Sequence, residues 1–141
     1  MRAQIDVGYN GFDEASSLEL IAAMKGKSMV SIGMASCKLG VEGAKAMAEM
    51  ASVMASLTKI LVGGNGLGDE GTTILCDALR ESTVSKVEEL NLYNNKIGPN
   101  GAKAIAALCV VAASLTSVRA SPELQPTTGP ALTHFFLARI D

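Results

Sequence analysis

Residues 87–101 read VEELNLYNNKIGPNG, and this stretch decides the fold. Its pattern is apolar-x-x-apolar-x-apolar-x-x-Asn-x-apolar-Gly-x-x-Gly, with fixed positions at Val87, Leu90, Leu92, Asn95, Ile97, Gly98 and Gly101. Residues 57–71, LTKILVGGNGLGDEG, follow the same pattern, and residues 29–43, MVSIGMASCKLGVEG, follow it with Cys37 in the slot of the Asn. A weaker copy near the start of the chain has Asn10 in that slot. Successive slots lie 27, 28 and 30 residues apart, which is typical of a repeat protein.

Each copy contains the signals of a strand, a turn and a helix. Alternating apolar residues such as Ile60 and Val62 predict a short strand with one buried face. The slot residue can bond turn backbone that has lost its partners in the sheet. We therefore predict four structural turn residues, which are Asn10, Cys37, Asn65 and Asn95. Units of this size cannot bury both faces alone, so stacking is expected to give a parallel sheet on one side and helices on the other.

The residues between strand and helix carry further signals. Gly68 and Gly98 suit a tight turn with a positive φ. Asp69 suits a helix cap or an acid in the first helical turn, and Pro99 suits the first helical position. These residues therefore predict helices that begin close to positions 69 and 99.

Residues 66–71, GLGDEG, also match the G-x-G-x-x-G pattern of dinucleotide-binding loops. Asp69 and Glu70 would place negative charge where a pyrophosphate sits on a helix N-terminus, which opposes that reading. The same turn recurs as LGVEG and IGPNG, so the repeat already explains the glycines. We expect no cofactor at this loop.

The copies resemble leucine-rich repeats, whose pattern is L-x-x-L-x-L-x-x-N/C-x-L. The long period and the Gly-x-x-Gly before the helix are most similar to the ribonuclease-inhibitor subtype, which also occurs in NOD-like receptors and in the GTPase-activating protein of Ran. The resemblance covers residues 3–118. It implies an α/β fold, a right-handed β/α solenoid in a short horseshoe arc, with the parallel sheet on the concave face and the helices on the convex face. No residue matches the loop residues of the Ran activator, so neither GTPase activation nor ribonuclease inhibition is carried over.

Composition excludes several classes of function. The chain is 48% hydrophobic and 18% charged with a net charge of −2, which excludes a wholly disordered chain and does not favour nucleic acid or an anionic membrane as partner. Its single histidine, His134, cannot assemble a nucleophile–base–orienter set, so we expect neither an enzyme nor a metal site. The longest charge-free apolar run, residues 104–118, is too short for a membrane helix and is predicted to be a buried helix leading into a strand.

The cysteine pattern bears on the compartment. Cys37, Cys76 and Cys109 lie too far apart in sequence for a zinc knuckle or a redox pair. No secretory signal is visible at the N-terminus. We therefore expect three buried, reduced thiols in a cytoplasmic protein, with the nucleus as the alternative.

The repeat pattern divides the chain into two parts. Residues 1–118 are predicted to form a solenoid of about four repeats with a partial fifth, and residues 119–141, with prolines among Ser, Thr and Gly, an irregular tail or loose cap. The first predicted strand leaves no room for the polar cap that terminal repeats need. We therefore expect self-association through the first repeat, around Ile5, Val7 and Phe12.

Strand residues between the buried positions are expected to face the concave side, because side chains alternate along a strand. Aligning the repeats places small residues over the N-terminal half of that face. The larger candidate partner-binding residues are Lys59, Leu61, Glu89, Asn91, Tyr93 and Arg119. Lys59 and Glu89 share a row on adjacent strands, so mutual pairing explains them at least as well as binding. Tyr93 and Leu61 are predicted to form a small apolar anchor, since tyrosine is enriched at binding hot spots.

These observations predict a non-catalytic module that binds a protein partner through its concave face. The alternative is a structural segment of a larger leucine-rich-repeat receptor or scaffold, resembling NOD-like receptors or the Ran activator, with no separate activity.

Overall fold

The computed structural model describes residues 3–120 of the chain, which alternate between strand and helix. The elements in chain order are β1 (Ala3–Asp6), α1 (Glu14–Met24), β2 (Met29–Gly33), α2 (Gly40–Ala51), β3 (Lys59–Leu61), α3 (Gly68–Glu81), β4 (Glu89–Asn91), α4 (Pro99–Val111) and β5 (Ser117–Arg119). Ala120 is buried directly after β5. Residues 121–141, which hold most of the predicted tail and His134, lie outside the described residues.

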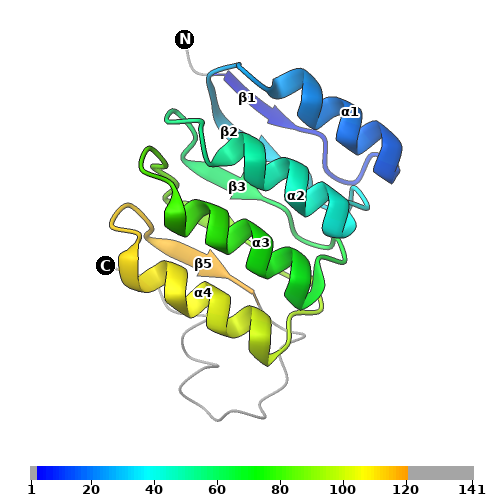
Figure 1. Cartoon of the computed structure of the whole chain (residues 1–141). Helices are drawn as coiled ribbons and strands as arrows, with labels where there is room; N and C mark the ends of the chain where they lie inside the picture. The colour runs from blue at the N-terminus through cyan, green and yellow to red at the C-terminus, as the bar shows by residue number, and fades with distance from the viewer. Residues whose placement is uncertain (1–2, 121–141) are drawn as a thin grey trace.

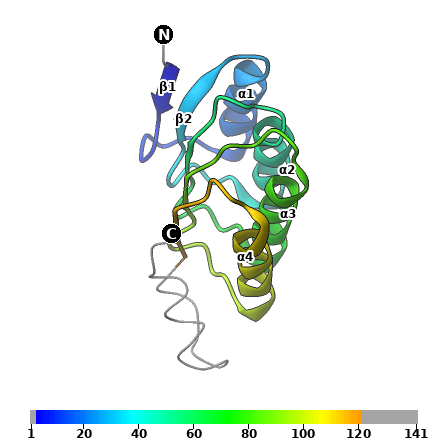
Figure 2. The same ribbon diagram turned by 90° about the vertical axis from the view of Figure 1, so that its left-hand side faces the viewer.

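The five strands form one parallel sheet in the order β1-β2-β3-β4-β5, so every strand pairs with its neighbours in sequence. The pairing keeps the repeats in register, and Ile32, Ile60, Leu90 and Val118 lie in one row across the sheet. Figure 1 shows the four helices side by side over one face of the sheet. Figure 2, turned by 90°, shows the strands and the helices as two layers. The predicted β/α solenoid is therefore confirmed.

The core lies between the two layers and is aliphatic. The side chains of Ile32, Ile60 and Leu90 are fully buried, and Leu75 and Ile105 meet them from α3 and α4. Because strand side chains alternate, the residues on either side of each buried position point to the opposite face of the sheet. None of the helices within residues 3–120 covers that face. Within residues 3–120, no helix has the length and apolar character needed to cross a membrane.

The second glycine of the repeat motif serves helix packing. A Cβ added at Gly71 would lie 3.1 Å from the Cβ of Leu67 and 3.2 Å from the Cβ of Ala44. A side chain at this position would therefore push α3 away from α2. Repeat stacking accounts for this glycine without any phosphate ligand, in agreement with the reading of the GLGDEG loop.

The helix starts differ in part from the prediction. Pro99 is the first residue of α4, as predicted. Asp69 lies in the first turn of α3 as an acid but does not cap that helix, whose N-cap residue is Leu67. Its Oδ1 instead accepts hydrogen bonds from the backbone N–H groups of Gly98 (2.6 Å) and Gly101 (2.9 Å) in the next repeat. Asp69 is thus a cap for the neighbouring helix.

The expected positive φ is found at Gly68 (63°) but not at Gly98, whose φ is −102°. The residue before a proline is restricted to extended conformations, so Pro99 explains the difference. Asn94 and Lys96 of this turn do adopt left-handed conformations, as the equivalent Gly64 and Gly66 do in the preceding repeat. Asparagine tolerates that region better than most residues.

Candidate functional site

Two buried asparagines hold the turns at one edge of the sheet. The Nδ2 group of Asn95 donates to the carbonyl oxygens of Leu92 (2.9 Å) and Val62 (3.0 Å), in its own repeat and the preceding one. Its Oδ1 accepts from the backbone N–H groups of Asn65 (2.8 Å) and Leu67 (3.3 Å). Asn95 therefore bonds turn backbone, as predicted, and in doing so joins two consecutive turns.

Asn65 repeats this arrangement one step earlier in the chain. Its Oδ1 accepts from the N–H groups of Cys37 (2.8 Å) and Leu39 (3.2 Å), and its Nδ2 donates to Met34 and Val62. The resulting ladder of bonds fixes the C-terminal ends of the strands. It thereby fixes the position of the last exposed side chain of each strand.

The two N-terminal slots are weaker versions. Cys37 is buried and its thiol lies 3.5 Å from the carbonyl oxygen of Ala35 and 3.8 Å from that of Val7. Asn10 is exposed and donates only to the carbonyls of Val7 and Gly8. The slot residues of the first two repeats therefore make fewer buried hydrogen bonds than Asn65 and Asn95 do.

The exposed sheet face brings the predicted candidate residues together. Residues Gln4, Ser31, Lys59, Glu89 and Ser117 form one row across the five strands. Residues Asp6, Gly33, Leu61, Asn91 and Arg119 form the next row. Tyr93 follows Asn91 on the same side and lies beside Gly63 of the preceding repeat. The register predicted for these rows is the register observed.

Lys59 and Glu89 pair with each other. The Nζ of Lys59 lies 3.7 Å from the Oε1 of Glu89, and both side chains are partly exposed. Such a surface pair contributes little stability, about 0–1 kcal/mol. Its effect here is that the two charges largely cancel, so mutual pairing explains these residues without a partner.

Tyr93 and Arg119 form the most distinctive group on the face. The guanidinium carbon of Arg119 lies 5.6 Å from the centre of the Tyr93 ring, within the range of a cation–π contact. Tyr93 remains 42% exposed, so the contact covers only part of the ring. Half-buried Leu61 lies two strands away from Arg119 in the same row. The three side chains place an aromatic ring, an aliphatic group and a cation on adjoining strands.

A local hydrogen bond, not predicted from the sequence, positions Tyr93. The Oδ1 of Asn91 accepts from the backbone N–H of Tyr93 at 2.9 Å. Asp6 does the same for Gly8 at 3.0 Å, at the equivalent place in the first repeat. Asn91 is therefore partly structural. In both repeats an Asp or Asn lies two residues before the backbone N–H group from which its side chain accepts. This spacing is the sequence signal for the role.

The N-terminal half of the face is nearly bare. A Cβ added at Gly33 would lie 2.8 Å from the carboxylate carbon of Asp6, and one added at Gly63 would lie 3.0 Å from the carbonyl oxygen of Tyr93. Because these glycines have no side chain, neighbouring groups lie directly over the backbone. The result is a low surface beside the projecting Tyr93 and Arg119.

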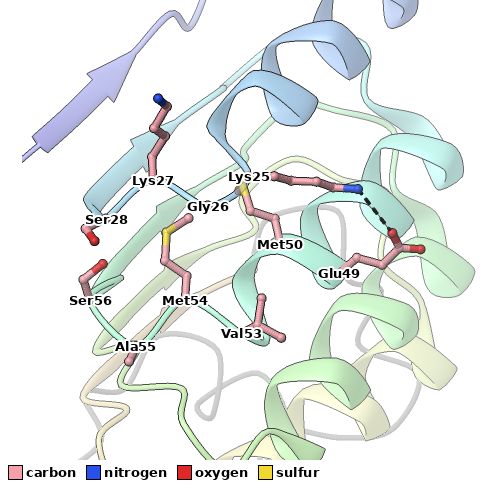
Figure 3. A pocket seen from close by; sticks show the side chains of 10 residues that line it. All are labelled: Lys25, Gly26, Lys27, Ser28, Glu49, Met50, Val53, Met54, Ala55 and Ser56. Atoms are coloured by element: carbon pink, nitrogen blue, oxygen red, sulfur yellow. Dashed lines mark ion pairs between the residues drawn. The ribbon is translucent and has the colours of Figure 1, made fainter.

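A separate hollow lies at the opposite edge, between the ends of α1 and α2. Its volume is about 580 Å³. Figure 3 shows its lining, in which Met50, Val53 and Met54 supply apolar surface. Its one carboxylate, from Glu49, pairs with Lys25 at 3.7 Å. The lining includes no histidine or cysteine, so it supplies no nucleophile–base pair.

The thiols are buried or partly buried rather than reactive. Burial raises the pKa of Cys76 well above its usual range and that of Cys109 to about 11. Burial, followed by the negative charge of Asp6, raises the pKa of Cys37. Raised pKa values keep thiols protonated and weakly nucleophilic near neutral pH. Cys109 is only half-buried, whereas the sequence placed it in the core. Among residues 3–120, no cluster of three metal-ligating side chains occurs.

The comparisons with known proteins agree with this architecture. A family model described as "Leucine Rich repeat" matches residues 85–106. A solved structure of leiomodin-1, described as its actin-binding site 2, is similar to this chain with a TM-score of 0.76 and 18% sequence identity. That similarity covers 86% of this chain and 72% of the leiomodin chain. Comparison with curated proteins gives no match.

Proposed function

We propose that this chain is a non-catalytic leucine-rich-repeat module that binds a protein partner through the exposed face of its sheet. The observation that carries the proposal is the exposed group of Tyr93, Leu61 and Arg119. Tyrosine and arginine dominate binding hot spots because they bury large surfaces and also offer hydrogen-bond donors. Lys59, Glu89 and Asn91 surround the group as polar contacts.

The proposal includes the ribonuclease-inhibitor-like subtype and a cytoplasmic or nuclear location. Slot spacings of 28 and 30 residues, and helices of 12 to 14 residues in the three best-formed repeats, support the subtype. The three free cysteines support a reducing compartment.

The test is capture of partners by matched variants. The immobilised wild-type chain is compared with Tyr93→Ala on the sheet face and Lys103→Glu on the exposed face of α4. We expect at least one protein to be retained by wild type and by Lys103→Glu but lost with Tyr93→Ala. A partner lost with Lys103→Glu and kept with Tyr93→Ala would move the binding site to the helix face and overturn the proposal. Actin is the first purified partner to test, since the similar leiomodin segment is an actin-binding site.

A second candidate function is that of a stacking segment within a larger assembly of repeats. It is favoured by Ile5, Val7 and Phe12, which pack against the core but are only partly buried on the first repeat. β1 is also the first strand of the sheet order, so its outer edge has no paired strand among the described residues. Self-association through this edge stays a prediction.

Light scattering with an Ile5→Lys variant tests the second candidate. Concentration-dependent association of wild type that Ile5→Lys abolishes would support it. A wild-type chain that stays monomeric at high micromolar concentration would contradict it. Association that is unchanged in Ile5→Lys would place the contact elsewhere.

A further inference from the structure

We propose that the partner presents a carboxylate next to an apolar side chain, and that these groups occupy the Tyr93–Leu61–Arg119 end of the sheet face. This inference rests on the proposed function and specifies the chemistry of its partner. It follows from which charges on the face are already balanced and which are not.

Four charged residues lie in the two paired rows of the face. Lys59 and Glu89 balance each other at 3.7 Å. Arg119 makes no ion pair within residues 3–120, and its cation–π contact with Tyr93 leaves its N–H donors without a carboxylate. The guanidinium fork is suited to a planar carboxylate, which it can bind through two parallel hydrogen bonds. A partner carboxylate at this point would therefore satisfy Arg119.

The contact with Tyr93 makes this site better defined than a lone surface arginine. A side chain held over a ring loses less conformational freedom on binding than a freely moving one. Gly63 adds no side chain beside Tyr93, whose Cβ lies 3.8 Å from the position a Cβ at Gly63 would take. An apolar side chain next to the carboxylate can pack there and exclude water from the ion pair, which strengthens it.

The fourth charged residue of the face, Asp6, indicates how a partner segment would be oriented across the strands. Asp6 lies in the same row as Arg119 but on β1, at the other end of the sheet. Four strand spacings separate them, or roughly 19 Å. The residues between them in this row are Gly33, Leu61 and Asn91, which carry no charge. A segment lying across the strands with its acid on Arg119 is thus favoured to place a base toward Asp6, about six extended residues away.

Selection from a random 12-residue peptide library displayed on phage tests the inference. The bait is the full chain as wild type, Arg119→Glu, Tyr93→Ala or Lys103→Glu, each with its melting temperature checked. We expect wild type and Lys103→Glu to select peptides with Asp or Glu beside an aromatic or aliphatic residue. Arg119→Glu is expected to replace the acid by Lys or Arg, and Tyr93→Ala to select no such peptides.

A synthetic peptide from the wild-type selection gives the quantitative arm. Replacing its acid by the matching amide should weaken binding to wild type about tenfold, and to Arg119→Gln by no more than about twofold. Peptides that depend on Tyr93 but show no preference for an acid would overturn this inference and leave the proposed function standing. Absence of any peptide that depends on Tyr93 would overturn both.

Discussion

Replacing Asn95 by alanine tests the ladder of turn bonds that fixes the sheet face. The side chain is fully buried. Its removal leaves the N–H groups of Asn65 and Leu67 and the carbonyl of Leu92 without the hydrogen bonds they make to it. The carbonyls of Val62 and Tyr93 keep other donors, which are the Nδ2 group of Asn65 and the N–H of Gly64. Three buried groups therefore lose their partners.

Each buried group left unpaired costs about 1–3 kcal/mol. With three such groups, we expect Asn95→Ala to lower the free energy of unfolding by at least about 3 kcal/mol. For a domain of this size that corresponds to a fall in melting temperature of at least about 10 °C. Chemical denaturation followed by circular dichroism, together with a thermal melt, measures both quantities.

The chain supplies matched controls at equivalent positions. Asn65→Ala leaves the N–H groups of Cys37 and Leu39 and the carbonyl of Met34 unpaired and should cost a similar amount. Asn10→Ala removes only exposed bonds and should cost less than about 1 kcal/mol, since water replaces them. Melting temperatures of Asn95→Ala and Asn65→Ala within a degree of wild type would refute the reasoning, as would an equal loss for Asn10→Ala.

Three further predictions concern single side chains. Asp69→Ala should lower stability by about 0.5–2 kcal/mol in denaturation, because α4 loses its cap, whereas exposed Glu70→Ala should change little. Hydrogen bonding from Ser16 lowers the pKa of Asp13 below 3.8 in the folded state. Asp13→Ala should therefore lower the melting temperature by its full amount above pH 3.8, and the difference from wild type should disappear as the pH falls further. Thermal melts across that pH range measure this difference. Thr72→Val should raise the melting temperature, because the buried Thr72 hydroxyl has no hydrogen-bond partner within residues 3–120.

Much of the fold can be predicted from the sequence because every repeat has the same pattern of apolar and turn residues. The spacing of Asn65 and Asn95 fixes the strand register, and the period of two then fixes which side chains share the exposed face. That is why the sequence alone places Leu61 and Tyr93 on one surface. The pairing of Lys59 with Glu89 follows from the same register.

The features that could not be predicted depend on contacts that occur in only one repeat. Asp69 caps the next helix only because α3 and α4 lie at a particular offset. Glu14 occupies the equivalent position in the first repeat and makes no such bond among the described residues. The conformation of Gly98 follows from Pro99, a neighbour absent from the other copies. The contact of Arg119 with Tyr93 joins two rows of the face, and side-chain reach between rows is not contained in the period.

The affinity of Tyr93→Ala for a partner captured by the wild-type chain tests the central claim most directly. Calorimetry with the purified partner should show binding weakened by about 1–3 kcal/mol, or roughly 5- to 150-fold, with an unchanged melting temperature. Lys103→Glu should bind as wild type does. Unchanged affinity for Tyr93→Ala together with lost affinity for Lys103→Glu would show that the partner binds the helix face and would contradict the account.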